Sequence, residues 1–254
     1  MRNPFIAVSV VFALAATLAV STPEARAGLV ADYSLDGGAT FLTLVSGTSG
    51  STLNGGSATL GVFSLSNLSV LSNSPGTPGL AKLLSDSLDL QNMSTSTASI
   101  EFVFSDTGFT APTTPPSILL NSHIGGSVTT SSADNFASFT SCISTTNANL
   151  TSCTGASDVA GAGSPDITQN AFLNDQYDII TSLAGPYSIT SIWTVTLGAG
   201  SDVGFQANAS LTPAVITKSA IPEPVSVSLL GVALVGLGAV RRRRAPSTKV
   251  DAAI

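Results

Sequence analysis

The sequence predicts an all-β domain, an antiparallel β-sandwich of jelly-roll or Ig-like type, followed by one C-terminal transmembrane helix. Apolar and polar residues alternate with a period of two over several segments, as they do in strands with one buried face. Clusters of Gly, Pro, Asn and Ser, such as 72–79 and 110–116, separate these segments. The chain has no repeat period, so the sequence does not favour a β-solenoid.

The alternation is clearest in four segments: 29–35, 99–105, 187–197 and 203–211. Trp193 lies on the apolar phase of the third segment, where Ile192 interrupts the pattern. That phase favours a core position for Trp193 over a sugar-stacking one. The loop 198–202 is short and contains two glycines, so we expect the last two segments to form a β-hairpin.

Weaker patterns predict further strands, at 41–45, 58–71, 118–120 and 136–143. We therefore expect eight to ten strands between residues 28 and 220, a segment long enough for one sizeable core. Only 79–89 and 166–183 have sequences that would permit a short helix.

The N-terminus has the organisation of a signal peptide. Arg2 gives a short positive region, 5–20 is apolar, and Ala25 and Ala27 form a small-x-small cleavage site before Gly28. We expect residues 1–27 to be removed on export. The alternative is that they stay as an N-terminal membrane anchor.

The C-terminal segment 221–254 has three parts. Pro222-Glu223-Pro224 precedes an uncharged apolar run, 225–240, and Arg241, Arg242, Arg243 and Arg244 follow it. A helix over this run would span about 24 Å, slightly less than a typical hydrocarbon core. The positive-inside rule keeps the arginines cytoplasmic, so residues 28–220 are exported. An ordinary tail anchor is an alternative; a buried core helix is disfavoured, because four arginines would abut the core.

These tail residues resemble the PEP-CTERM sorting domain of bacterial surface proteins, which has the same order of motif, helix and Arg cluster. The resemblance covers about 34 of the 254 residues, and Ala245–Ile254 extend beyond the point where the family often stops. It implies that an exosortase, a membrane cysteine transpeptidase, processes the tail of an inner-membrane-anchored precursor. It also implies association with exopolysaccharide and biofilm at the surface of a Gram-negative cell. It implies no activity for residues 28–220.

The charge and the Ser/Thr content of residues 28–220 limit the classes of binding partner that the sequence favours. The segment has two lysines, no arginine and twelve acidic residues, so its net charge is 2 − 12, or −10. Such a charge disfavours nucleic acid as a partner. Serine and threonine make up close to a third of the segment, which is typical of bacterial surface and matrix proteins rather than cytosolic enzymes.

Cys142 and Cys153 are the only cysteines. Export would place them in an oxidising compartment, so we expect a disulfide, which would contribute about 2–3 kcal/mol by the chain-entropy model. A metal pair is disfavoured, because the chain has no further cysteine and one histidine, His123. The polar loop 143–152 is expected at a surface tip.

No catalytic constellation emerges from the sequence. The chain has one histidine for a Ser–His–Asp triad and no Gly-x-Ser-x-Gly elbow. Glu101 is a candidate glycosidase carboxylate without an evident second one, and its strand phase indicates a solvent-facing position.

Calcium is the one cofactor for which the sequence offers candidate ligands. Solvated acidic side chains remain the default interpretation, so no bound cofactor or metal is expected. The two candidate sets are Asp32 and Asp36 with Gly37-Gly38, and Asn174, Asp175 and Asp178. Neither set matches the Asp-x-Asp-x-Asp-Gly loop.

The sequence therefore favours an exported, non-catalytic cell-surface or extracellular-matrix protein that is sorted by its tail and associated with exopolysaccharide. The alternatives are a lectin-like carbohydrate-binding module and, with less support, a secreted hydrolase.

Overall fold

The computed structural model describes residues 28–214, with the side chains of 84–87 and 162 excepted. The predicted signal peptide with Ala25 and Ala27 lies outside the described residues. So do Pro222, Glu223 and Pro224, the predicted helix 225–240 and the arginines 241–244. Within residues 28–214, no helix is long and apolar enough to cross a bilayer.

The described residues form strands and no helix. In chain order the strands are β1 (Leu29–Ser34), β2 (Leu42–Gly47), β3 (Thr52–Leu60), β4 (Phe63–Ser72), β5 (Ala81–Asn92), β6 (Ala98–Phe109), β7 (Ile118–Thr130), β8 (Phe136–Ser144), β9 (Asp158–Gly163), β10 (Ala171–Ile180), β11 (Tyr187–Leu197) and β12 (Asp202–Pro213).

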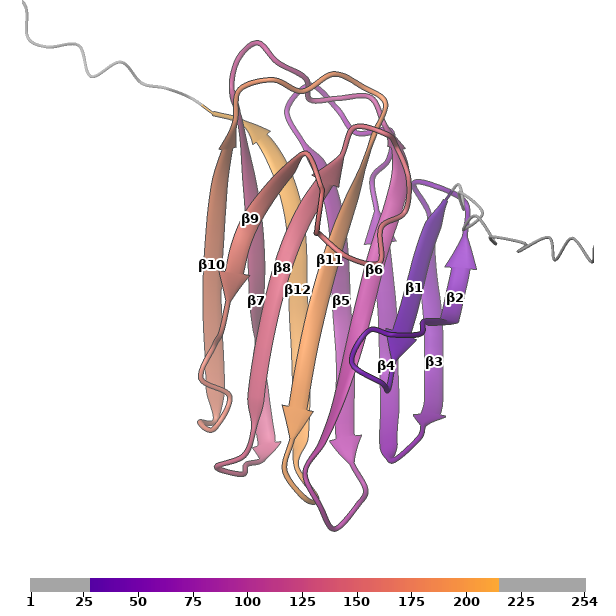
Figure 1. Ribbon diagram of the computed structural model, residues 1–254, viewed down its shortest axis with the longest axis vertical. Helices are drawn as coiled ribbons and strands as arrows, with labels where there is room; N and C mark the ends of the chain where they lie inside the picture. Colours follow the sequence, from indigo (N-terminus) through magenta and orange to yellow (C-terminus); the bar gives the residue numbers. More distant parts are fainter. Residues whose placement is uncertain (1–27, 215–254) are drawn as a thin grey trace, which may run out of the picture. The chain divides into compact units, whose positions relative to one another are not determined.

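Two antiparallel sheets pack face to face, as Figure 1 shows. The first sheet has the strand order β2-β1-β6-β11-β8-β9, and the second has the order β10-β7-β12-β5-β4-β3. The predicted all-β sandwich is confirmed at this level. The four clearest alternating segments of the sequence are β1, β6, β11 and β12, because one face of each strand is buried against the opposite sheet.

The core lies between the sheets and is centred on aromatic residues. Trp193 is fully buried, as its phase predicted, with its ring centroid 4.8 Å from that of Phe104 and 6.2 Å from that of Phe205. Phe104 belongs to the first sheet and Phe205 to the second, so Trp193 joins the two layers of the sandwich.

Twelve strands are present where eight to ten were expected, and both segments that would permit a helix are strands. Residues 79–89 contribute to β5, which pairs with β4 and β12 and buries Leu83, Leu88 and Leu90. Residues 166–183 contain β10, at the edge of the second sheet. Pairing with neighbouring strands decided these segments, because their apolar spacing fits either structure.

The segment 58–71 is two strands instead of one. β3 and β4 form a hairpin whose turn contains Gly61, with a φ of +61°. Glycine adopts this left-handed backbone without the steric penalty of a Cβ atom, so the chain reverses within an otherwise continuous pattern.

The predicted hairpin between β11 and β12 is wrong. β11 pairs with β6 and β8 in the first sheet, whereas β12 pairs with β5 and β7 in the second. The loop 198–202 therefore carries the chain from one sheet to the other. A short Gly-containing loop is compatible with either connection, and burial of both strands on opposite sides of the core selected the crossing.

The side chain of Asn92 holds the connection between β11 and β12 in place. Its side chain is fully buried, and its Nδ2 donates to the main-chain oxygens of Ser96, Leu197 and Gly198 at 2.8, 2.9 and 3.1 Å. Its Oδ1 accepts from the backbone N and the Oγ of Ser94 at 3.0 and 2.8 Å. One amide thus links the β5–β6 connection to the β11–β12 connection.

A chain of serine hydroxyls also joins the sheets. Trp193 Nε1 donates to Ser191 Oγ at 3.0 Å, and Ser141 Oγ donates to the same oxygen at 3.5 Å. Ser141 Oγ also lies 2.7 Å from Ser122 Oγ, on β7 of the second sheet. These buried polar groups satisfy one another, as a dry interior requires.

Candidate functional site

The outer face of the first sheet carries an open groove of about 450 Å³. Its floor comes from the outward side chains of β8 and β11, and its two walls are the loop after β1 and the loop after β8. The lining residues are Gly37, Gly38, Glu101, Ser138, Phe139, Thr140, Thr151, Ser152, Cys153, Thr154, Ile192 and Thr194. Hydroxyl side chains dominate this lining.

The loop after β8, which was predicted as a surface tip, instead folds back across the outer face of the first sheet. Gly108 N donates to Asn147 Oδ1 at 2.7 Å, and Asn149 Nδ2 donates to the backbone oxygen of Gly28 at 3.1 Å. Ser188 Oγ donates to the backbone oxygen of Ala148 at 2.6 Å. These bonds reach residues far away in the sequence, so the loop is a packed part of the domain.

Hydroxyl groups of the sheet are buried beneath this loop. Ser105 Oγ donates to Asn149 Oδ1 at 3.0 Å and lies 2.7 Å from Thr190 Oγ1. Ser105 is 2% exposed, and Thr190 is fully buried, although both lie on the face of the sheet turned away from the core. A polar loop covers a polar face here, and hydrogen bonds offset the loss of water.

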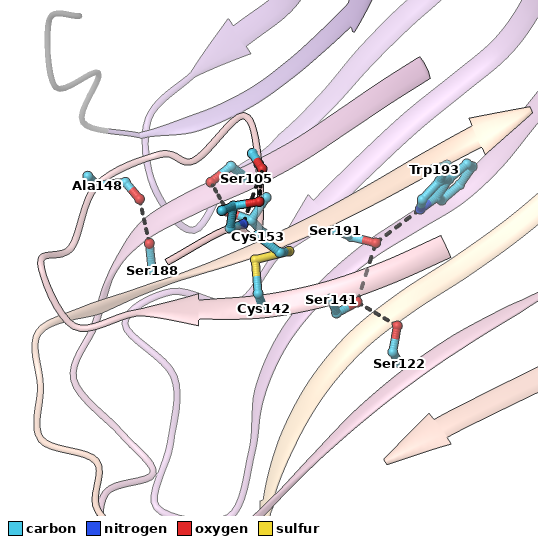
Figure 2. The surroundings of a disulfide bond; sticks show 12 residues. Ser105, Ser122, Ser141, Cys142, Ala148, Cys153, Ser188, Ser191 and Trp193 are labelled. Carbon is cyan, nitrogen blue, oxygen red and sulfur yellow. Dashed lines mark hydrogen bonds between the residues drawn. A yellow bond between two sulfur atoms is a disulfide. The ribbon is translucent and has the colours of Figure 1, made fainter. Parts of the chain in front are cut away.

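The predicted disulfide between Cys142 and Cys153 is present, and it fixes the end of this loop on β8. Figure 2 shows the bond next to the contacts of Ser105 and Ser188, with the chain from Ser122 to Trp193 on the other side of the strand. Cys153 belongs to the groove lining together with its neighbours 151, 152 and 154. The disulfide thus holds one wall of the groove.

Glu101 forms part of the opposite side of the groove. It lies on β6, on the outward phase that the sequence indicated, and it is half-buried. Burial raises the pKa of its carboxyl group, because removing water disfavours the charged form. Gly38 lies over it: a Cβ atom added there would lie 3.1 Å from Glu101 Oε2, and its φ of +85° also favours glycine.

Asp36 and Asp32, the first calcium candidates, lie at the same end of β1. Asp36 Oδ1 accepts from Ser34 Oγ at 2.7 Å and Thr40 N at 2.9 Å, and its Oδ2 accepts from Thr40 Oγ1 at 2.6 Å. These bonds hold the pKa of the Asp36 carboxyl well below its ordinary value. Its oxygens thus brace their own loop, next to Gly37 and Gly38 of the groove wall.

The second candidate set lies on β10. Successive side chains of a strand point to opposite faces, so Asp175 faces away from Asn174 and Asp178. Asp175 Oδ1 lies 2.8 Å from His123 Nδ1 on β7. Over residues 28–214, no three His, Cys, Asp or Glu side chains gather in a group that could hold a metal ion.

The structure brings Glu101 and Cys153 together on one surface and leaves His123 on the outer face of the other sheet. Sequence reasoning missed the groove, whose floor and walls come from distant segments. One signal was present: Ile192 breaks the alternation of β11, and its side chain lies on the groove floor among hydroxyl groups.

Comparison with known proteins does not assign the chain to a family. No protein-family model and no curated protein matches the chain. Among solved structures, the chain is similar to the enzymatically active domain of tailspike protein 4 from bacteriophage CBA120, with 11% identity and a TM-score of 0.29. The match covers 58% of this chain and 19% of the tailspike chain, and it is too slight to carry an argument about fold or function.

Proposed function

We propose that the chain is an exported, non-catalytic cell-surface or extracellular-matrix protein whose β-sandwich binds polysaccharide in the groove between 37–38 and 151–154. The observation that carries this proposal is the lining of the groove. Six hydroxyl side chains and one carboxylate line a broad and open trough, together with Ile192, Phe139, Cys153 of the disulfide and two glycines.

This lining suits sugars better than other ligands. Small-molecule pockets are mostly apolar and enclose their ligands, and protein interfaces depend on aromatic and Arg anchors. Sugars present many hydroxyl groups, and Ser and Thr side chains both donate to and accept from such groups. Because the trough is open, an extended polymer can lie across it.

Individual sugar units are expected to bind weakly. Phe139 is the one aromatic residue among the described groove residues, and it is 2% exposed, so it offers no stacking surface. Strong retention on a polysaccharide would then come from several protein copies on one polymer, or from several contacts along it.

A non-catalytic role is supported by the carboxylates. Glycoside hydrolysis requires two carboxyl groups on either side of the scissile bond. Among the described residues that line the groove, Glu101 is the one carboxylate. A secreted hydrolase therefore has less support than a binding protein.

We propose the same localisation that the tail predicts. The disulfide is compatible with an oxidising compartment outside the cytoplasm. The precursor would be held in the inner membrane by 225–240 and the arginines 241–244, processed by an exosortase-type enzyme at Pro222-Glu223-Pro224, and passed to the cell surface or medium.

We also propose the jelly-roll type for strands β5 to β12. Their order is β5-β12-β7-β10 in one sheet and β6-β11-β8-β9 in the other, which is the arrangement expected of two Greek keys in eight strands. Lectin domains use this architecture, and the likeness supports the proposal by analogy alone.

Co-sedimentation of the full chain with the polysaccharide of its own host tests the proposal. The double variant Thr140→Val and Thr194→Val removes two groove hydroxyls and keeps their branched shape. Thr196→Val is the matched control, since Thr196 lies on the same strand but outside the groove lining. We expect the double variant to bind several-fold more weakly and the control to bind normally. Absence of binding by the wild type would refute the proposal.

A further inference from the structure

We infer that the groove selects polysaccharides that carry free amino groups, through an ion pair between a sugar ammonium and the carboxylate of Glu101. The inference rests on the proposed polysaccharide binding and names the class of polymer. Two independent observations support it: the partnering of Glu101 and the charge of the domain.

Glu101 differs in its partners from Asp36 and Asp166. Asp36 and Asp166 are both surrounded by hydroxyl or amide donors that lower their pKa values. For Glu101, burial is the cause of the shift and no donor contributes. Burial also raises the pKa of Asp158, but Asp158 lies outside the groove lining. A partly desolvated carboxylate that faces a groove is stabilised when a ligand supplies the missing donors.

An ammonium group meets this requirement best. It carries three N–H donors, and a charge-assisted hydrogen bond is roughly twice as strong as a neutral one. A sugar hydroxyl would supply one neutral donor. A bare divalent cation would need several oxygen ligands, and Glu101 is the one carboxylate among the described residues at the groove.

The charge of the whole domain acts in the same direction. Between residues 28 and 214 the sequence has twelve acidic residues and one basic residue, Lys82, so the formal net charge is 1 − 12, or −11. Such a field attracts cationic polymers and repels those rich in uronate or sulfate groups. Lys82 lies on β5, in the second sheet, whereas the groove is on the first.

A sugar polymer fits the groove better than a basic peptide does, because the rest of the lining is rich in hydroxyl groups and the groove is open. The ammonium fixes the position of one residue of the polymer, and the hydroxyls of Thr140, Thr151 and Thr194 face its neighbours. Whether the sugar nitrogen carries a substituent therefore decides whether the ion pair with Glu101 can form, since acetylation removes the positive charge.

Calorimetric titration of the full chain with short β-1,4-linked oligomers of glucosamine, and with N-acetylglucosamine oligomers of equal length, tests the inference. Glu101→Gln removes the charge and keeps the side-chain shape. Asp134→Asn is the control, because it removes one charge at an exposed position outside the groove lining. We expect the amine oligomer to bind about tenfold more tightly, the size of one charge-assisted bond. Glu101→Gln should abolish this preference, and the control should keep it.

The preference should also fade as the pH falls through the raised pKa of Glu101, because the protonated carboxyl group cannot form the ion pair. Equal binding of the two oligomers, or an undiminished preference in Glu101→Gln, would overturn the inference and leave the proposed function intact. An equal Glu101-dependent response to oligolysine would also overturn it in favour of a peptide ligand. If neither the oligomers nor the host polysaccharide binds, the proposed function itself fails.

Discussion

Replacing Asn92 by alanine should be among the most damaging polar substitutions in the domain. The Asn92 side chain is fully buried where two connections between the sheets meet, and it forms five hydrogen bonds with residues 94, 96, 197 and 198. Ser94 is half-buried and Ser96 exposed, so water can replace their bonds. Leu197 and Gly198 are buried, so water has poor access to their carbonyl oxygens. Gly198 O keeps the backbone N of Ser201 as a donor at 3.1 Å, whereas Leu197 O loses the amide of Asn92.

The expected loss of stability follows from these partners. A buried polar group deprived of its partner costs about 1–3 kcal/mol, which applies to Leu197 O, and the lost bond to Gly198 O adds about 0.5–1.5 kcal/mol. We expect the free energy of unfolding to fall by about 2–4 kcal/mol. For a domain of this size, each kcal/mol lowers the melting temperature by about 2–4 °C, so the melting temperature should fall by about 10 °C.

The chain contains a convenient probe for this measurement. Trp193 is its only tryptophan and is fully buried, so its fluorescence reports the opening of the core. Urea titration of the full chain in non-ionic detergent, followed by this signal, compares wild type, Asn92→Ala and the control Gln91→Ala. Gln91 is the preceding residue of β5 and is exposed, so its loss should change stability by less than about 0.5 kcal/mol. A change below about 1 kcal/mol for Asn92→Ala would refute the reasoning.

Three further predictions concern the walls of the groove. The double variant Cys142→Ser and Cys153→Ser should lower the free energy of unfolding by about 2–3 kcal/mol, as measured by thermal melts. It should also weaken polysaccharide retention in co-sedimentation. Unchanged retention would show that the hydrogen bonds alone hold the loop. Glu101→Gln should make the domain slightly more stable at pH 7, because the raised pKa means that folding disfavours the charged carboxylate. Urea titrations should show this gain vanishing below about pH 4, where the wild type is neutral even when unfolded. Asp36→Asn should lower stability at pH 7, since a depressed pKa contributes stability above the unfolded value. This difference should shrink as the pH falls below about 4, and a constant difference across these pH values would contradict the role of the carboxylate.

The alternation of side chains was sufficient to predict β1, β6, β11 and β12 because it is a local property. Each of these strands has one face against the core, and the pattern records that face residue by residue. β5 and β10 could not be predicted with the same certainty, because a local pattern decides only where it fits a single type of structure. Their spacing does not distinguish strand from helix, and the hydrogen bonds that decide it come from β4, β7 and β12.

The disulfide also followed from the sequence, because the two cysteines have one possible pairing and the sequence predicts export of the domain. The path of the loop that it closes did not follow. Its anchors, Gly28, Gly108 and Ser188, lie 121, 39 and 40 residues from the atoms that bind them. A loop rich in Ser, Thr and Asn is equally compatible with exposure to water and with packing on a polar face of the sheet.

The sequence by itself determined the class of the fold, the phase of the strongest strands, the pairing of Cys142 with Cys153 and the acidic character of the domain. It also predicts sorting signals at 1–27 and 221–254, and the mass of the mature protein would test this prediction. Only the tertiary structure decided which sheet receives each strand and that Glu101 faces the loop of Cys153 across a groove. The physical reason is that alternation fixes which face of a strand is buried, whereas neighbours in a sheet are chosen by contacts between segments far apart in the chain.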